Sequence, residues 1–255
     1  MQTGHITQYF DVASLSIDTF WLLFFGLIVY LRREDKREGY PLVAEGTGEL
    51  VSGLFPATPP KKTYLLQDGS TLTLPREPNE RTLALKPVAG QLGGTPSEPT
   101  GNPLVDAVGP ASYTLRQDHP EHSWEGEPRI LPLRAAKAFY IDPRDPDIRG
   151  WDVVGADGNS AGTVTEAWVD VVEPQVVYYE VSIAGGSTVL VPARLAVLNE
   201  DTSKLVVQSI TAAQFANVPR IKNPNQVTLL EEDKITGYFA GGKLYATPDR
   251  QEPLV

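Results

Sequence analysis

The sequence predicts a single N-terminal transmembrane helix followed by a mainly-β domain, built as a small antiparallel barrel or sandwich with a short C-terminal helix. Three observations predict this architecture. Residues 12–31 form an apolar segment, and all 22 Lys and Arg residues of the 255-residue chain lie at or after Arg32. Short runs with period-two alternation follow from about residue 133, and a helix-capping pattern stands near the C-terminus.

Residues 12–31 match the length and composition of a membrane span. They contain one ionisable side chain, Asp18, and their helical length of about 30 Å equals the hydrocarbon thickness of a bilayer. A secretory signal peptide would carry positive charge before the apolar run, and a soluble amphipathic helix would show a polar stripe. The sequence has neither feature, and the run is long for a buried core helix.

A cluster of basic residues directly after this segment predicts its orientation. Arg32, Arg33, Lys36 and Arg37 follow the last apolar residue, and Lys and Arg collect on the cytoplasmic side of membrane proteins. We therefore expect these four residues at the membrane interface, residues 1–11 as a periplasmic tail, and the chain after the helix in the cytoplasm.

Residues 32–132 form a loop-rich segment. Positions 41–132 hold 14 Pro and 10 Gly residues, which interrupt helices and strands. One hairpin is predicted within the segment, with arms at 62–66 and 71–74 joined by the turn sequence QDGS. A long ordered segment of this kind usually lies across another surface; the alternative is a flexible tether.

Residues 133–255 have the pattern of a compact β domain with five or six short strands. Strand pairs are expected at 151–155 with 162–172, at 177–183 with 188–191, and at 195–198 with 204–207. Period-two alternation along 177–183 predicts a buried face with Val177, Tyr179, Val181 and Ile183, and an outward face with Tyr178, Glu180 and Ser182.

The C-terminal helix is predicted from its capping residues. Thr228 and Glu231 form a capping box, in which each side chain bonds the backbone amide of the other residue. Glu232 and Asp233 add negative charge to the first turn, where the helix dipole favours it. The glycine pair at 241–242 is expected to end the helix.

Composition argues against several classes of function. The chain has no cysteine, three His and one Met, so we expect no disulfide, thiolate site or His-rich metal site. Its net charge of −10 argues against a nucleic-acid partner. Nucleophile elbow, phosphate loop, zinc and dinucleotide motifs are absent from the sequence, so we expect no catalysis by this chain alone.

Two groups of titratable residues are candidates for function. His119 and His122 lie among the acidic residues Asp118, Glu121, Glu125 and Glu127. This group suits a metal site, a solvated acidic loop or a surface that collects protons. Asp170 and Glu173 stand three residues apart at a strand end, a spacing that suits either proton transfer or an ordinary turn.

Six stretches, in order along the chain, resemble the H subunit of the photosynthetic reaction centre of purple bacteria. They are YLRREDKREGYPL at 30–42, PTGNPLVDAVGPASY at 99–113, WVD at 168–170, QFANVP at 214–219, VTLLEEDK at 227–234 and YFAGGKLYA at 238–246. The resemblance implies one membrane helix and a cytoplasmic domain built around the small antiparallel PRC barrel.

The resemblance also implies partners and cofactors. By itself this chain would bind no cofactor, whereas the partner L and M chains hold bacteriochlorophyll, bacteriopheophytin, quinones and non-haem iron. The loop-rich segment would lie over the cytoplasmic face of L and M in the bacterial inner, intracytoplasmic membrane. Membrane lipids would surround the helix, beside a cytochrome subunit and a light-harvesting ring where the complex has them.

The role implied for the chain is proton conduction to the secondary quinone, which takes up two electrons and two protons. Family carboxylates at the positions of Asp170, Glu173 and Glu232 lie on that route. Two family histidines at the proton entrance fall on Glu125 and Glu127 when the chains are aligned on ILP at 130–132. Either these carboxylates collect protons in this chain, or His119 and His122 do so.

A second hypothesis is a membrane-tethered PRC-barrel adaptor outside photosynthesis, binding another protein or RNA. An adaptor of this kind would have the barrel without a segment that wraps L and M. The loop-rich residues 32–132 favour the reaction-centre subunit.

Overall fold

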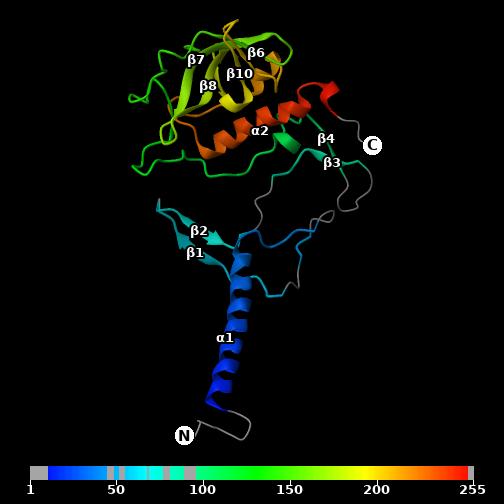
Figure 1. Ribbon diagram of the computed structural model, residues 1–255. Coiled ribbons are helices and arrows are strands. Elements are labelled where there is room, and N and C mark those ends of the chain that lie inside the picture. Colours follow the sequence, from blue (N-terminus) through cyan, green and yellow to red (C-terminus); the bar gives the residue numbers. More distant parts are fainter. Residues whose placement is uncertain are drawn as a thin grey trace. The chain divides into compact units, whose positions relative to one another are not determined.

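The computed structural model describes residues 11–44, 49–51, 55–67, 69–76, 81–88 and 96–251. The chain divides into two compact units (Figure 1). The first contains Met1–Thr82 and Pro87–Pro96, and the second contains Leu83–Lys86 and Ser97–Val255. The second unit thus begins upstream of residue 133, where we placed the start of the strand-rich domain.

Helix α1 (Val12–Glu34) is the main element of the first unit. The Asp11 carboxylate caps it by accepting a hydrogen bond from the Ser14 amide at 2.7 Å, which satisfies one of the free amides of the first turn. Its side chains are not buried within the chain. With the 3₁₀ turn η1 (Asp35–Arg37) it forms the one helical segment, among the residues described, that is long and apolar enough to cross a membrane.

The helix extends past the predicted end at residue 31 because basic residues occupy its last turn. Arg32 and Arg33 lie there, and positive charge is favourable near the carbonyl end of a helix. Both side chains are exposed, and Arg32 pairs with Asp35 at 3.5 Å. They are therefore accessible to a membrane surface.

Lys36 and Arg37 are instead held within the first unit. The Lys36 ammonium group is buried and donates a hydrogen bond to the Pro56 carbonyl at 2.5 Å. The Arg37 guanidinium pairs with Glu34 at 2.6 Å and donates to the Pro60 carbonyl at 2.9 Å. These two residues fix the chain that follows the helix.

The described residues before position 100 also form two small two-stranded sheets. Strands β1 (Lys62–Leu65) and β2 (Thr71–Leu74) pair antiparallel, with Lys62 opposite Leu74, which confirms the predicted hairpin. Strands β3 (Leu85–Pro87) and β4 (Ser97–Pro99) form a second two-stranded sheet.

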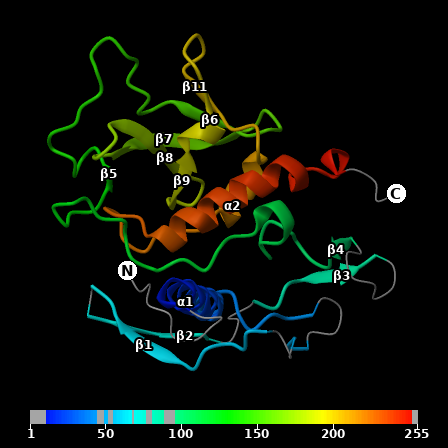
Figure 2. The same cartoon turned by 60° about the horizontal axis from the view of Figure 1, so that its bottom comes forward.

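The second unit is organised around one sheet of seven strands (Figure 2). Their order is β10-β11-β6-β7-β8-β9, and β5 pairs with β7. Neighbouring strands run antiparallel except β11 and β6, which run parallel. The strands are β5 (Ile130–Pro132), β6 (Asp152–Val154), β7 (Ser160–Asp170), β8 (Gln175–Ile183), β9 (Thr188–Pro192), β10 (Val197–Asn199) and β11 (Lys204–Val206).

The prediction of a solvent-facing Tyr178 on β8 is wrong. Both Tyr178 and Tyr179 are buried, whereas Val177 is only partly buried. Helix α2 (Leu229–Tyr245) covers this point of the face that was expected to meet solvent. The contact is visible in the hydrogen bond that the Tyr178 hydroxyl donates to Glu232 of that helix at 3.1 Å. Strict alternation fails where a second layer covers the outer face of a strand.

Helix α2 begins at the predicted capping box. Thr228 Oγ1 accepts from the Glu231 amide at 3.2 Å, and the Glu231 carboxylate accepts from the Thr228 amide at 2.9 Å. The prediction that the helix ends at the glycine pair is wrong, because it continues through Gly241 and Gly242 to Tyr245.

These two glycines have a packing role instead. A Cβ atom on Gly241 would lie 2.7 Å from the Ala111 Cα atom in the 3₁₀ turn η2 (Gly109–Ala111). A Cβ atom on Gly242 would lie 2.9 Å from the Ser209 carbonyl carbon. Both distances are shorter than van der Waals contact, so glycine permits the close approach of α2 to these segments.

Candidate functional site

A cavity of about 500 Å³ in the second unit gathers charged side chains from four places in the sequence. Asp170 ends β7, Glu173 lies in the following turn, and Glu232 projects from the first turn of α2. Glu121 and Arg129 line the same cavity from the loop before β5, and Arg194, which follows β9, borders it as well. The structure therefore brings together three residues that the resemblance singled out, Asp170, Glu173 and Glu232.

Asp170 is held as a carboxylate by three donors. Its side chain is 6% exposed and pairs with Arg129 at 2.8 Å. Its other oxygen accepts hydrogen bonds from the Val172 and Glu173 amides at 2.9 and 3.0 Å. Burial alone would raise the pKa of Asp170, but the bonds from Arg129 and from the two amides outweigh it and lower that pKa.

Arg129 connects the carboxylates of the cavity. Its guanidinium contacts Asp170 at 2.8 Å, Glu121 at 3.1 Å and Glu173 at 3.4 Å. The hydrogen bond to Asp170 raises the pKa of Arg129 further above its already high value, so the group stays positive. The ion pair follows from strand pairing, since β5 places Ile130 opposite Asp170 and so brings Arg129 beside it.

Glu232 has the opposite electrostatic environment. It accepts a hydrogen bond from the Tyr178 hydroxyl at 3.1 Å, and Tyr178 is itself buried. Burial raises the pKa of Glu232, the Tyr178 bond lowers it by less, and the negative charge of Glu121 raises it further. The cavity thus contains one carboxylate that favours the ionised form and one that binds a proton more readily than an ordinary glutamate.

Opposite pH effects on stability follow from this contrast. For Glu232, the unfolded chain ionises first as pH rises above about 4.5, so the raised folded pKa makes Glu232 a source of instability at neutral pH. Glu232→Gln should therefore raise the melting temperature at pH 7 and change it little at pH 4. For Asp170, the lowered folded pKa stabilises above pH 3.8 and this stabilisation is lost in acid.

Asp170→Asn should accordingly lower the melting temperature at pH 7, and the loss should shrink as pH falls below 3.8. Thermal unfolding of both variants between pH 3 and 8, followed by circular dichroism, checks both signs. Parallel pH profiles for the two variants would contradict the assignment.

The predicted proton-collecting residues lie on a short hairpin beside the cavity. The Ser123 amide donates to the Glu127 carbonyl and the Arg129 amide to the Glu121 carbonyl, each at 2.8 Å. Glu125 and Glu127 are exposed on its turn. Glu121 and Arg129, at the base of this hairpin, line the cavity, so the hairpin joins the exposed turn to Asp170.

His119 and His122 are also exposed, with ring centres 6.1 Å apart. The His119 ring nitrogens lie 2.9 Å from the Pro120 carbonyl oxygen and 2.6 Å from the Gln117 side-chain oxygen. Among the described residues there is no group of three or more His, Asp and Glu side chains placed to hold a metal ion.

Two residues of the site were missed by sequence reasoning, Arg129 and Tyr178, whereas Glu121 was already named in the titratable group around His119 and His122. Arg129 stands 41 positions before Asp170, and no motif connects two residues so far apart. Tyr178 was assigned to the wrong face of β8. The pairing of β5 with β7 and the packing of α2 on β8 would both have been needed to find them.

Comparison with protein families identifies the two parts of the chain. Residues 4–135 match the model for the photosynthetic reaction centre H-chain N-terminal region, which covers half of the chain. Residues 144–214 match the PRC-barrel domain, and this second match includes Asp170 and Glu173. The seven-stranded sheet, the apolar N-terminal helix and these two matches in succession lead to one assignment: the chain belongs to the photosynthetic reaction centre H-chain family.

Proposed function

We propose that this chain stabilises the L and M core of a photosynthetic reaction centre and conducts protons from the cytoplasm to the secondary quinone. The observation that supports the proton role is the cavity that gathers Asp170, Glu173 and Glu232. The family resemblance names these three positions, and they come from separate elements of the fold. Family membership supports the role as a subunit of the complex.

The chemistry of the cavity suits proton transfer. A relay needs groups that exchange protons over a range of affinities, at separations that side chains or single waters bridge. Asp170 and Glu232 differ in the direction of their pKa shifts, and Arg129 keeps Asp170, Glu121 and Glu173 within 3.4 Å of one guanidinium. The positive charge of Arg129 also limits repulsion between the carboxylates.

We propose that protons enter from the hairpin at 121–129. Glu125 and Glu127 take the positions of the family histidines, and His119 and His122 are exposed nearby. From this turn, Glu121 and Arg129 lead to Asp170 and Glu173. Glu232, with its raised pKa, holds the proton farther along the route.

Flash-induced proton uptake in the purified complex, followed with a pH-indicator dye, tests the role of Glu232. Glu232→Gln removes the titratable group and keeps an acceptor for the Tyr178 hydroxyl, so we expect uptake to slow roughly fivefold. Asp201→Asn is the control, because Asp201 is exposed in the turn between β10 and β11 and does not line the cavity. Equal rates in wild type and Glu232→Gln would contradict a role for this residue.

The cofactors of the proposed complex belong to its other chains. Bacteriochlorophyll, bacteriopheophytin, the quinones and the non-haem iron would be held by L and M. The loop-rich segment 32–132 would lie on their cytoplasmic face. A cytochrome subunit, a light-harvesting ring and lipids would contact the complex from outside, with exposed Arg32 and Arg33 facing lipid phosphates.

The proposed orientation places residues 1–11 in the periplasm and the second unit in the cytoplasm. Because the chain has no cysteine, single substitutions Thr3→Cys and Lys137→Cys report each side without background labelling of this chain. In spheroplasts, a membrane-impermeant maleimide should label Thr3→Cys alone, and Lys137→Cys should react only after the membrane is disrupted. The reverse labelling pattern would contradict this orientation.

A further inference from the structure

A second cavity in the second unit, of about 630 Å³, is lined by basic residues and by no carboxylate. Arg194 comes from the 3₁₀ turn η3 (Ala193–Leu195), Lys243 from the last turn of α2, and Arg250 from the 3₁₀ turn η5 (Pro248–Arg250). Three positive charges thus surround one hollow in a chain whose net charge is −10.

None of these three residues forms an ion pair within the part of the chain that the structure describes. Arg194 and Lys243 are exposed and make no ion pair there. The Arg250 guanidinium donates hydrogen bonds to the Gln208, Ser209 and Gly242 carbonyls at 3.0, 3.2 and 3.0 Å. Backbone carbonyls orient that guanidinium but leave its full charge in place.

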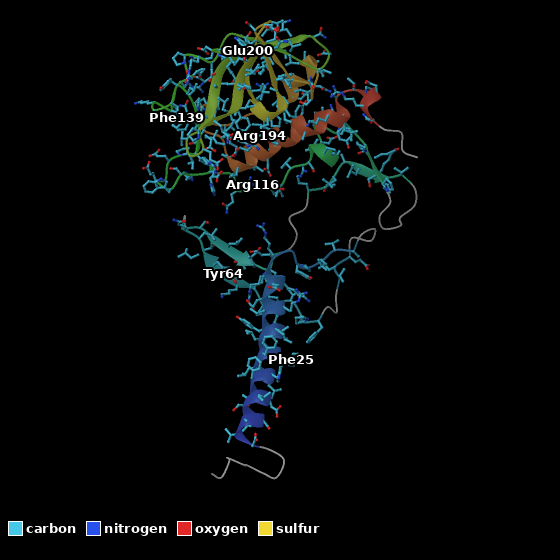
Figure 3. The ribbon with its side chains drawn as sticks, in the orientation of Figure 1. Phe25, Tyr64, Arg116, Phe139, Arg194 and Glu200 are labelled. Carbon is cyan, nitrogen blue, oxygen red and sulfur yellow. The ribbon has the colours of Figure 1, made fainter. Side chains whose placement is uncertain are left out.

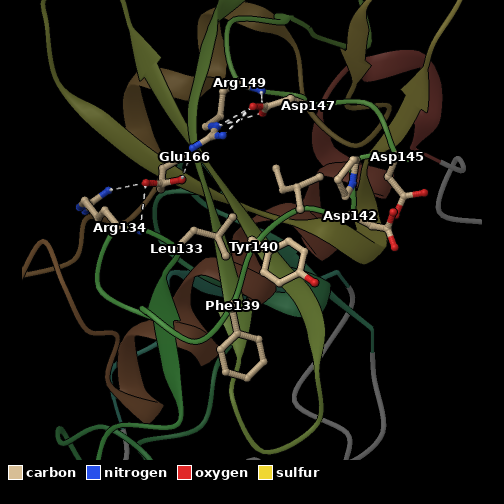
Figure 4. Close-up of a pocket in the computed structure, with 11 residues that line it drawn as sticks. Leu133, Arg134, Phe139, Tyr140, Asp142, Asp145, Asp147, Arg149 and Glu166 are labelled. Atoms are coloured by element: carbon tan, nitrogen blue, oxygen red, sulfur yellow. Dashed lines mark hydrogen bonds and ion pairs between the residues drawn. The ribbon is translucent and has the colours of Figure 1, made fainter.

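The cavity drawn in Figure 4 shows the contrasting arrangement. Its arginines also line a hollow, but each already has a carboxylate partner. Arg149 pairs with Asp147 at 2.6 Å, and Arg134 pairs with Glu180 at 2.9 Å. Positive charge there is paired within the chain, whereas Arg194 and Lys243 have no carboxylate at ion-pair distance among the described residues, although Arg194 also borders the cavity that contains Asp170.

Helix capping explains only part of the basic cavity. Lys243 and Arg250 both lie near the carbonyl end of α2, where positive charge is stabilising. Arg194 belongs to a different element, so the helix does not account for its position; it is labelled in Figure 3. Ser209 also lines the cavity, and its buried hydroxyl has no hydrogen-bond partner among the described residues.

We propose that this cavity binds a phosphate-bearing small anion. Guanidinium and ammonium groups are the usual ligands of phosphate and diphosphate groups, and Arg194, Lys243 and Arg250 line this one cavity beside the unpartnered Ser209 hydroxyl. Leu195 and Val197 supply an apolar wall, which suits a ligand that joins its phosphate to a nucleobase-bearing or an apolar group. The volume falls in the range of sites for small organic ligands.

Isothermal titration calorimetry on the purified complex, at fixed ionic strength, tests the site with three probes. Inorganic pyrophosphate tests the phosphate chemistry, ADP represents a soluble nucleotide, and dihexanoylphosphatidylglycerol represents a lipid headgroup. We expect pyrophosphate to bind, and the tighter of the other two probes identifies the source of the natural ligand. Tighter binding of ADP and tighter binding of the lipid both support a phosphate site, provided that pyrophosphate binds as well.

Substitution places the binding in this cavity. Arg194→Gln with Lys243→Gln should weaken pyrophosphate binding at least about tenfold. Lys137→Gln with Lys204→Gln removes the same charge from exposed positions outside the cavity and should change it less than twofold. Because the substituted side chains are exposed, the variants are expected to fold, which circular dichroism verifies. Failure of wild type to bind pyrophosphate, or equal weakening in both variants, would overturn the proposal.

Discussion

Asp170→Asn combined with Glu173→Gln is expected to slow the proton-coupled second electron transfer to the secondary quinone by at least about tenfold. Both substitutions preserve size and remove a titratable carboxyl group from the cavity. Arg129 keeps Glu121 as a partner at 3.1 Å, so the cavity should retain its shape. The first electron transfer, which needs no proton delivered to the quinone, should keep its rate.

Flash spectroscopy of the assembled complex measures both electron transfers in one preparation. Glu200→Gln with Asp201→Asn is the matched control, because it removes the same charge from exposed residues of the turn between β10 and β11 (Glu200 is labelled in Figure 3). Adding a small permeant weak acid should restore the rate in the cavity variant if proton supply is what it lacks. An unchanged second transfer in that variant would remove Asp170 and Glu173 from the route.

Replacing both glycines of α2, Gly241→Ala with Gly242→Ala, should lower the free energy of unfolding of the second unit by about 3 kcal/mol. Alanine is the better helix former by up to about 1 kcal/mol per residue, so an isolated helix would gain stability. Here the added methyl groups meet the Ala111 and Ser209 backbones at 2.7 and 2.9 Å. The helix must therefore move away from its neighbours.

Urea unfolding of the detergent-solubilised chain, followed by near-ultraviolet circular dichroism, measures this loss. Lys243→Ala is the control on the adjacent, exposed position of the helix and should change stability by less than about 0.5 kcal/mol. Stabilisation in the glycine variant would mean that the pair ends or loosens the helix, as the sequence alone suggested.

The sequence was sufficient for features that depend on residues close together in the chain. The apolar run after Asp11, the 62–66 and 71–74 hairpin and the Thr228–Glu231 capping box were all located correctly. Each depends on composition or on hydrogen bonds between residues a few positions apart, where propensity and spacing are informative.

Features that depend on contacts between distant segments were missed. The glycine pair at 241–242 has the composition of a helix end, and only the nearness of Ala111 and Ser209 explains why glycines stand inside the helix there. Period-two alternation predicts a solvent-facing Tyr178, but helix α2 covers this side chain. No sequence pattern marks Arg129 as a partner of Asp170; only the pairing of β5 with β7 brings the two residues together.

The candidate site shows the same division. Asp170 was a candidate from its spacing to Glu173 and Glu232 only through a family resemblance, and neither spacing nor composition placed Asp170 and Glu232 in one cavity. Their environments, an arginine and two amides for Asp170 and a buried tyrosine for Glu232, arise from tertiary packing. The direction of a pKa shift is therefore a property of the fold that the sequence does not reveal.

The central claim is that this chain works as the H subunit of a pigment-containing complex. Its most direct test is purification of the tagged full-length chain from its native membranes, followed by an absorption spectrum and a protein gel. We predict that L and M accompany the chain and that the spectrum contains bacteriochlorophyll and bacteriopheophytin bands that bleach reversibly in light. A chain recovered from intact membranes without L, M or pigment would contradict the claim.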